Sequence, residues 1–101
     1  MDTDNLSNEA YDAIIREAEC FTHNLTLRFA VVAADCRTEE EYLNEISEMI
    51  AELRVADADD LYDFFWAEPP SRKDLNAALD RISENIQRVR EIPLDKRTYF
   101  Y

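Results

Sequence analysis

The chain has 101 residues, of which 47% are hydrophobic, and a formal net charge of -12, values that favour a single globular domain with its own apolar core over a disordered chain. It contains no glycine, which excludes the glycine-rich loops of P-loop and dinucleotide-binding proteins and the Gly-x-Ser-x-Gly turn of hydrolases. The strong negative charge, with no basic patch of useful size, argues against direct binding to nucleic acid or to an anionic membrane.

The negative charge is concentrated in the middle third of the chain. Residues 35–68 contain 12 acidic and 2 basic residues, a balance of -10, whereas residues 69–101 contain 5 acidic and 7 basic residues, a balance of +2. Two interpretations are open: the two segments attract each other within the fold, or the middle third attracts a basic partner.

The first predicted helix covers residues 7–35. Ser7 is a good N-cap, and apolar residues recur with a helical period from Tyr11 to Val32. Residues 25–34 are apolar on nearly all sides, which is typical of a central, buried helix. Residues 22–24 are mediocre helix formers, so the pattern also allows a kink or a short break there.

The two cysteines lie on this predicted helix and in the turn directly after it. In a continuous helix, the 16 positions that separate Cys20 from Cys36 correspond to roughly 24 Å, too far for a disulfide, so we expect both thiols to be reduced. No signal-like segment opens the chain, and the longest apolar run, residues 30–34, is too short to span a membrane. We therefore expect a cytoplasmic protein that makes no membrane contact.

The second predicted helix covers residues 39–55 and has the clearest start in the chain. Thr38 and Glu41 stand at the N-cap and N3 positions of a capping box. Beside the buried stripe of this helix lie four glutamates with no lysine to neutralise them, here called the glutamate ridge: Glu41, Glu45, Glu48 and Glu52. Such a ridge is either a solvated helix face or a surface that steers a basic partner.

A short helix is predicted over residues 59–67, ended by Pro69-Pro70. Its spacing places one aromatic-rich face toward the core and a second face, with two more aromatics and two acids, beside it. The core face consists of Leu61, Phe64 and Phe65, and the second face consists of Asp59, Tyr62, Asp63 and Trp66. Tyrosine and tryptophan are frequent binding hot spots, so the second face either anchors a partner or also packs inside.

The last predicted helix covers residues 72–91, with Ser71 as its N-cap, and an aromatic tail follows over residues 93–101. We expect this tail to dock on its own bundle through its terminal aromatics. Without glycine, the helix ends should rely on Asn, Asp and Pro. The whole pattern predicts an all-α fold, a compact antiparallel bundle of three long helices and one short helix.

Candidate residues for catalysis are few. His23 is the only histidine, so no site that needs two imidazoles can form within one chain. We expect no catalytic residue, no metal and no cofactor. Phosphotransfer or metal chemistry through His23, with Glu19 one turn before it, is the weakest alternative.

A helix that opens on Glu39-Glu40-Glu41, followed by a short helix with Asp60-Leu61 and clustered aromatics that ends at prolines, resembles the immunity proteins of nuclease bacteriocins. The resemblance covers about residues 38–70. In that family an acidic second helix and the tyrosines of the short third helix bind the basic nuclease domain. The family's Asp-Leu-Ile-Tyr-Tyr-Pro corresponds here to residues 60–65, where Asp63 and Phe64 replace the paired tyrosines.

The sequence thus predicts a small acidic protein-binding module, an inhibitor of a basic protein such as a toxin, a nuclease or a nucleic-acid-binding complex. It would act in the manner of an immunity protein or antitoxin, or by mimicking nucleic acid. The predicted contact residues are the glutamate ridge together with Asp59, Tyr62, Asp63 and Trp66. The alternative is a structural or adaptor subunit with no catalytic role that self-associates, for example as a homodimer, through the first or the last predicted helix. The apolar residues 25–34 favour this alternative.

Overall fold

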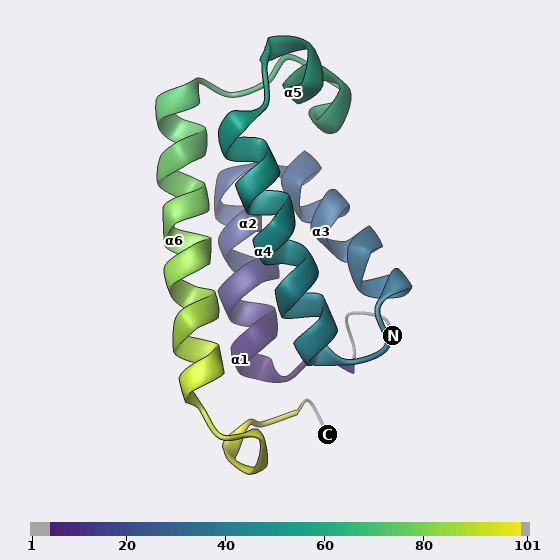
Figure 1. The fold of residues 1–101 in the computed structure, drawn as a ribbon, viewed down its shortest axis with the longest axis vertical. Helices are drawn as coiled ribbons and strands as arrows, with labels where there is room; N and C mark the ends of the chain where they lie inside the picture. The colour runs from purple at the N-terminus through teal and green to yellow at the C-terminus, as the bar shows by residue number, and fades with distance from the viewer. Residues whose placement is uncertain (1–4, 100–101) are drawn as a thin grey trace.

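The computed structural model describes residues 5–99, and in this range the chain forms an all-α, compact globule of five helices without a strand (Figure 1). The elements in chain order are α1 (Asn8–Tyr11), η2 (Asp12–Arg16) and α2 (Glu17–Phe21), which together form one continuous helix, then α3 (His23–Asp35), α4 (Glu39–Val55), α5 (Ala58–Phe65), α6 (Arg72–Glu91) and the 3₁₀ turn η3 (Leu94–Lys96). None of the helices described is long and apolar enough to cross a membrane.

The predicted helix over residues 7–35 is in fact two helices, so the expected set of three long helices and one short helix was wrong. The first helix contains a π-helical turn, η2, and ends at Phe21, and the second is α3. Between them Thr22 is extended, with φ −144° and ψ 148°, and its hydroxyl accepts a hydrogen bond of 3.1 Å from the Leu25 N–H. Thr22 therefore caps α3, in the stretch with the weakest helix propensity.

α4 and α6 begin at their predicted caps and coincide with their predicted bounds. The Thr38 hydroxyl accepts from the Glu41 N–H at 3.1 Å, and the Ser71 hydroxyl accepts from the Asp74 N–H at 3.2 Å. In a capping box, the Glu41 carboxylate would accept a hydrogen bond from the N–H of the N-cap residue, Thr38. Here it accepts instead from the N–H of the preceding residue, Arg37, at 3.3 Å. α5 spans Ala58–Phe65, slightly earlier than the predicted 59–67.

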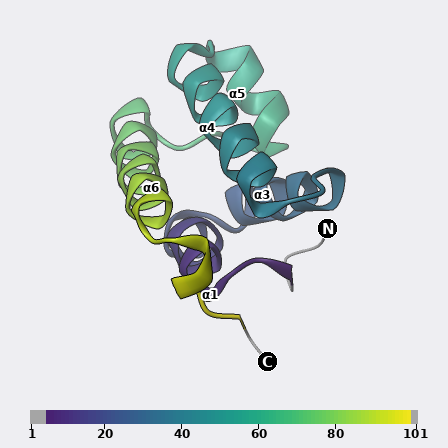
Figure 2. The same ribbon diagram turned by 60° about the horizontal axis from the view of Figure 1, so that its bottom comes forward.

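The core lies between α1–α2, α3, α4 and α6, which surround a common interior in Figure 2, and it also includes Leu61 and Phe65 of α5. Its largest fully enclosed side chains include Tyr42, Phe29 and Phe65. The Tyr42 hydroxyl donates a hydrogen bond of 2.8 Å to the Phe29 carbonyl, which satisfies its buried polar atom. Burial, and after it the nearby Cys36, raises the pKa of Tyr42 above its ordinary value. α3 and α4 are thus joined by a hydrogen bond within the core.

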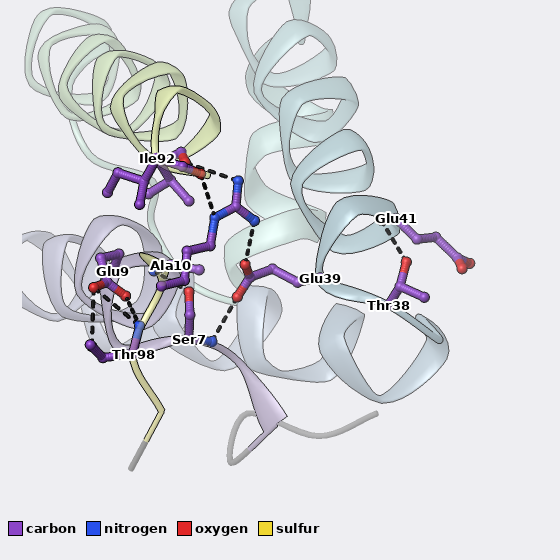
Figure 3. Close-up of polar contacts among 10 residues, drawn as sticks. Ser7, Glu9, Ala10, Thr38, Glu39, Glu41, Ile92 and Thr98 are labelled. Atoms are coloured by element: carbon purple, nitrogen blue, oxygen red, sulfur yellow. Dashed lines mark hydrogen bonds and ion pairs between the residues drawn. The ribbon is translucent and has the colours of Figure 1, made fainter. Parts of the chain in front are cut away.

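A buried ion pair holds the C-terminal tail against the start of α4. The Arg97 guanidinium lies 2.7 Å from the Glu39 carboxylate, and the two side chains are only 4% and 7% exposed. The other Glu39 oxygen accepts a hydrogen bond of 2.6 Å from the Ser7 N–H (Figure 3). One carboxylate therefore connects both ends of the described chain to α4.

Thr98 adds a second attachment, to the first turn of α1. The Asn8 N–H donates to the Thr98 carbonyl at 2.7 Å, and the Thr98 N–H donates to the Glu9 carboxylate at 3.0 Å. Tyr99 is 43% exposed, and Phe100 and Tyr101 lie outside the described residues. Up to Thr98 the tail therefore docks on its own bundle through polar groups, whereas the expected contacts of Phe100 and Tyr101 fall outside the described residues.

Arginines close the C-terminal ends of three helices in this glycine-free chain. Each guanidinium donates to backbone carbonyls in the last turn of a helix or just after it, where carbonyls lose their intrahelical partners. At the end of α4, Arg72 donates to the carbonyls of Leu53 and Ala56. At the end of α5, Arg28 donates to those of Asp63 and Phe64, and at the end of α6, Arg97 donates to those of Val89 and Ile92. No Asn or Asp takes a left-handed cap, because the only positive φ in residues 5–99 belongs to Trp66, whereas Pro93 directly follows the C-cap of α6.

Candidate protein-binding surface

The glutamate ridge lies on the solvent side of α4. Glu41, Glu45, Glu48 and Glu52 are all exposed. Their orientation follows from the opposite, buried side of the helix, which is formed by Tyr42, Leu43, Ile46, Ile50 and Leu53. Residues at this spacing share one side of a helix, so burial of the apolar stripe turns the four carboxylates outward.

The carboxylates of this region have almost no cationic partner within the described residues. Of the 12 acids in residues 35–68, only Glu39 forms an ion pair, with Arg97. The other basic residues of the last third that form ion pairs, Arg81 and Arg88, bind Glu17 and Glu84, which lie outside the middle third. Ion pairs between the last third and the middle third are thus limited to the buried Glu39–Arg97 pair and to Arg54–Asp80, whose acid comes from the last third. Apart from Glu39, the acids of α4 and α5 are exposed.

α5 separates its aromatics between the core and the solvent, a choice that the sequence left open for Tyr62 and Trp66. Asp57 caps the helix by accepting from the Asp60 N–H at 2.9 Å. The side chains of Leu61 and Phe65 are buried, and the half-buried Phe64 packs edge-to-face against Phe65. Burial of this face leaves the second face outside, where Tyr62 and Trp66 are 56% and 60% exposed and Asp59 and Asp63 are exposed.

Arg28 and Asn24 of α3 fix the end of α5, a role that the sequence analysis missed. The Asn24 side-chain amide donates to the Phe65 carbonyl at 2.6 Å, and the Arg28 Nε donates to the Phe64 carbonyl at 2.8 Å. The Arg28 guanidinium also lies 3.9 Å from the centre of the Trp66 ring. The sequence did contain a signal for this role, because Arg28 is the one charged residue in the otherwise mostly apolar residues 25–34. A charged side chain on a buried helix needs a partner.

A pocket of about 420 Å³ separates the C-terminal half of α4 from α5. Its lining is Met49, Glu52, Leu53, Val55 and Ala56 from α4 and the residue after it, with Asp60 and Phe64 from α5. One carboxylate comes from each helix, and the remaining side chains are apolar. The pocket therefore joins the glutamate ridge to the helix that carries Tyr62 and Trp66.

The remaining sequence candidates lie outside the pocket lining. His23 is exposed at the first position of α3, and Glu19 is exposed on α2. Across the described residues, no group of three or more His, Cys, Asp and Glu side chains is arranged to hold a metal ion. Cys20 is exposed and Cys36 is buried. Burial, followed by the charges of acidic neighbours, raises the pKa of Cys36, which disfavours its thiolate.

Comparisons with protein-family models, with curated proteins and with solved structures find no match for this chain.

Proposed function

We propose that this chain is a small acidic protein-binding module that inhibits a basic protein partner and has no catalytic role of its own. The observation that supports the proposal is the unpaired negative charge of residues 35–68, where 12 acids and 2 bases leave a balance of -10. Of these acids, only Glu39 forms an ion pair within the described residues. Proteins with a basic surface that would complement this charge include basic toxins, nucleases and nucleic-acid-binding complexes. The resemblance to bacteriocin immunity proteins supports the same partner class.

In the proposed mechanism, α4 attracts the partner and α5 provides the contact residues. The glutamate ridge attracts and orients a basic partner, an effect that raises the association rate and falls with salt. Tyr62 and Trp66 then supply apolar contact area with hydrogen-bonding edges, which is how hot-spot residues act. Arg28 holds Trp66 in place before the partner arrives, so little side-chain entropy is lost on binding.

The proposed scaffold is a compact antiparallel helical bundle in the reducing environment of the cytoplasm. The exposed thiol of Cys20 and the buried thiol of Cys36 support that compartment. In this view the bundle presents a rigid acidic surface and blocks the partner by occupying its basic site.

The proposal can be tested by affinity capture with a matched charge control. The immobilised protein is exposed to cell extract at low and high salt, and the retained proteins are identified by mass spectrometry. The ridge variant E45K/E48K/E52K leaves Glu41 in place because Glu41 contacts the start of α4. The control variant E19K/E91K/D95K makes the same change in net charge at three exposed acids elsewhere.

We expect a basic protein to be retained at low salt by the parent and by the control variant, and to be lost by the ridge variant. The purified partner should also lose its activity when the parent is added. Retention that the ridge substitutions leave unchanged, or the absence of any retained basic protein, would contradict the proposal.

A second candidate function is self-association, favoured by apolar residues on the outer side of α3. Leu27 and Val31 are 40% and 56% exposed and lie one turn apart. If this side of α3 forms a homodimer, light scattering should detect a concentration-dependent dimer that the L27E/V31E variant abolishes. A strict monomer at all concentrations excludes this candidate.

A further inference from the structure

The pocket between α4 and α5 has two chemically distinct parts. Its apolar lining comes from Met49, Leu53, Val55, Ala56 and Phe64, and its charged lining comes from Glu52 and Asp60. A volume of about 420 Å³ lies in the range of small-molecule sites, so it can hold one long side chain. An occupant that matches both parts must combine an apolar stem with a charged end.

The sign of that charge follows from the surrounding ion pairs. Neither Glu52 nor Asp60 forms an ion pair within the described residues, and no basic side chain lines the pocket. The nearby cations have other partners: Arg54 pairs with Asp80 at 2.7 Å, and Arg72 donates to backbone carbonyls at the end of α4. The two carboxylates are therefore left to an external cation.

Arginine fits this site better than lysine. Its guanidinium presents donors in a planar fork, which can reach two carboxylates that come from two different helices, and it loses hydration more easily than an ammonium. It also stacks on aromatic rings, and Phe64 already has the Arg28 guanidinium 5.1 Å from its ring centre. The aliphatic stem of arginine would cover the apolar lining from Met49 to Ala56.

We propose that this pocket binds an arginine side chain of the basic partner, with Glu52 and Asp60 as its two carboxylate acceptors. The inference rests on the proposed function, because it names the group by which the partner is recognised. It assigns Asp60 a role that the prediction of Asp59, Tyr62, Asp63 and Trp66 did not include.

The test is an NMR titration of the isotope-labelled full chain with single-residue probes. The probes are N-acetyl-arginine methylamide, its neutral citrulline counterpart, its lysine counterpart and its uncharged norleucine counterpart. We expect the arginine probe to give saturable shifts centred on the pocket-lining residues, with a dissociation constant on the order of millimolar. Each of the other three probes should bind at least about tenfold more weakly, equivalent to roughly 1.4 kcal/mol.

Variants separate the pocket from the general acidity of the surface. E52Q/D60N removes both proposed acceptors and should reduce arginine binding at least about tenfold. E48Q/D59N makes the same change in charge, on the same two helices and in the same first turn of α5, at positions outside the pocket lining. It should bind the arginine probe like the parent. Circular dichroism and Trp66 fluorescence must match between the two variants to show that both are folded.

Several results would overturn the inference. Equal binding of lysine, citrulline or norleucine removes the assignment to arginine, and arginine shifts spread along the whole ridge remove the assignment to the pocket. Equal losses in E52Q/D60N and E48Q/D59N leave only a general effect of charge. If a captured basic partner binds E52Q/D60N as well as it binds the parent, while the ridge variant does not bind it, the proposed function is supported and the arginine pocket is ruled out. If the arginine probe binds as expected but no basic protein is captured, the proposed function falls.

Discussion

Trp66 has a left-handed backbone conformation at the end of α5, with φ 56° and ψ 21°. For a bulky L-residue this conformation costs roughly 1–2 kcal/mol, and glycine usually takes the position. The stack on Arg28, at 3.9 Å from the ring centre, provides a compensating interaction. The same geometry leaves the indole 60% exposed. The strained cap therefore also presents an aromatic ring at the surface, as backbone strain at binding sites often does.

Two substitutions separate the strain from the stack. W66A removes the stack and keeps a side chain in the left-handed conformation, whereas W66G removes both. We expect W66G to be more stable than W66A by about 1 kcal/mol in urea denaturation followed by circular dichroism. A67G serves as the control for the greater freedom of glycine in the unfolded chain, and it should be neutral or slightly destabilising. A W66G variant that is no more stable than W66A would show that position 66 carries no strain.

At the scale of elements, α5 is held in place mainly from its C-terminal end. α3 supplies Asn24 and Arg28, which bind the last carbonyls of α5, while Leu61 and Phe65 bury its inner face. A helix of 8 residues is too short to be stable by itself, so its position depends on these contacts.

Removal of the Arg28 side chain should therefore loosen α5. We expect R28A to lower the free energy of unfolding by roughly 1.5–3 kcal/mol, because two charge-assisted hydrogen bonds and a stack are lost. Since Trp66 is the only tryptophan of the chain, its fluorescence should report the change directly. R37A removes an exposed arginine and should change stability by no more than about 0.5 kcal/mol. Equal stabilities of R28A and R37A would contradict the role of Arg28.

Helix bounds were predictable from the sequence where local signals agree. α4 and α6 combine a capping residue with an uninterrupted apolar period, and both were located correctly. The sequence pattern allowed a break at Thr22 but did not predict one, because the apolar period continues on both sides of this residue. Spacing alone showed which residues of α5 share a face, but it left open whether the face with Tyr62 and Trp66 is exposed. Arg28, however, acts on residues more than 30 positions away, and no local pattern reports such a contact.

At the scale of the whole molecule, the tail should respond to acid through Glu9. Partial burial acts to raise the pKa of Glu9, but hydrogen bonds from Thr98 and the charge of Arg97 outweigh it and lower the pKa below its ordinary value of 4.5. A lowered pKa in the folded state means that ionised Glu9 stabilises the docked tail above about pH 4.5, and that this contribution disappears as the pH falls through the lower folded pKa. We expect the amide of Thr98 to shift and to lose exchange protection over that range. In E9Q this titration should be absent, and its persistence there would assign it to another group.

Of the substitutions considered, removal of one partner of the Glu39–Arg97 pair should cause the largest loss of stability. Both side chains are almost fully buried, so removal of one leaves the other as an uncompensated charge. We expect R97A to lower the free energy of unfolding by roughly 3–5 kcal/mol, measured by urea denaturation, whereas E39L/R97M should recover much of that loss. The exposed pair Arg16–Asp12, with side chains 63% and 60% exposed, is the comparison, and D12A should cost less than about 1 kcal/mol.

The effects of this pair should also be separable from partner binding. Glu39 begins α4, a helix of 17 residues, and Glu52 of the pocket lies 13 positions further on, roughly 20 Å away along the helix. The tail and α5 lie at opposite ends of the molecule in Figure 1. Folded R97A should therefore bind the arginine probe like the parent, although it unfolds at lower urea. If R97A costs no more than D12A, the buried pair does not hold the chain ends. If R97A loses probe binding while still folded, the two ends of α4 are coupled.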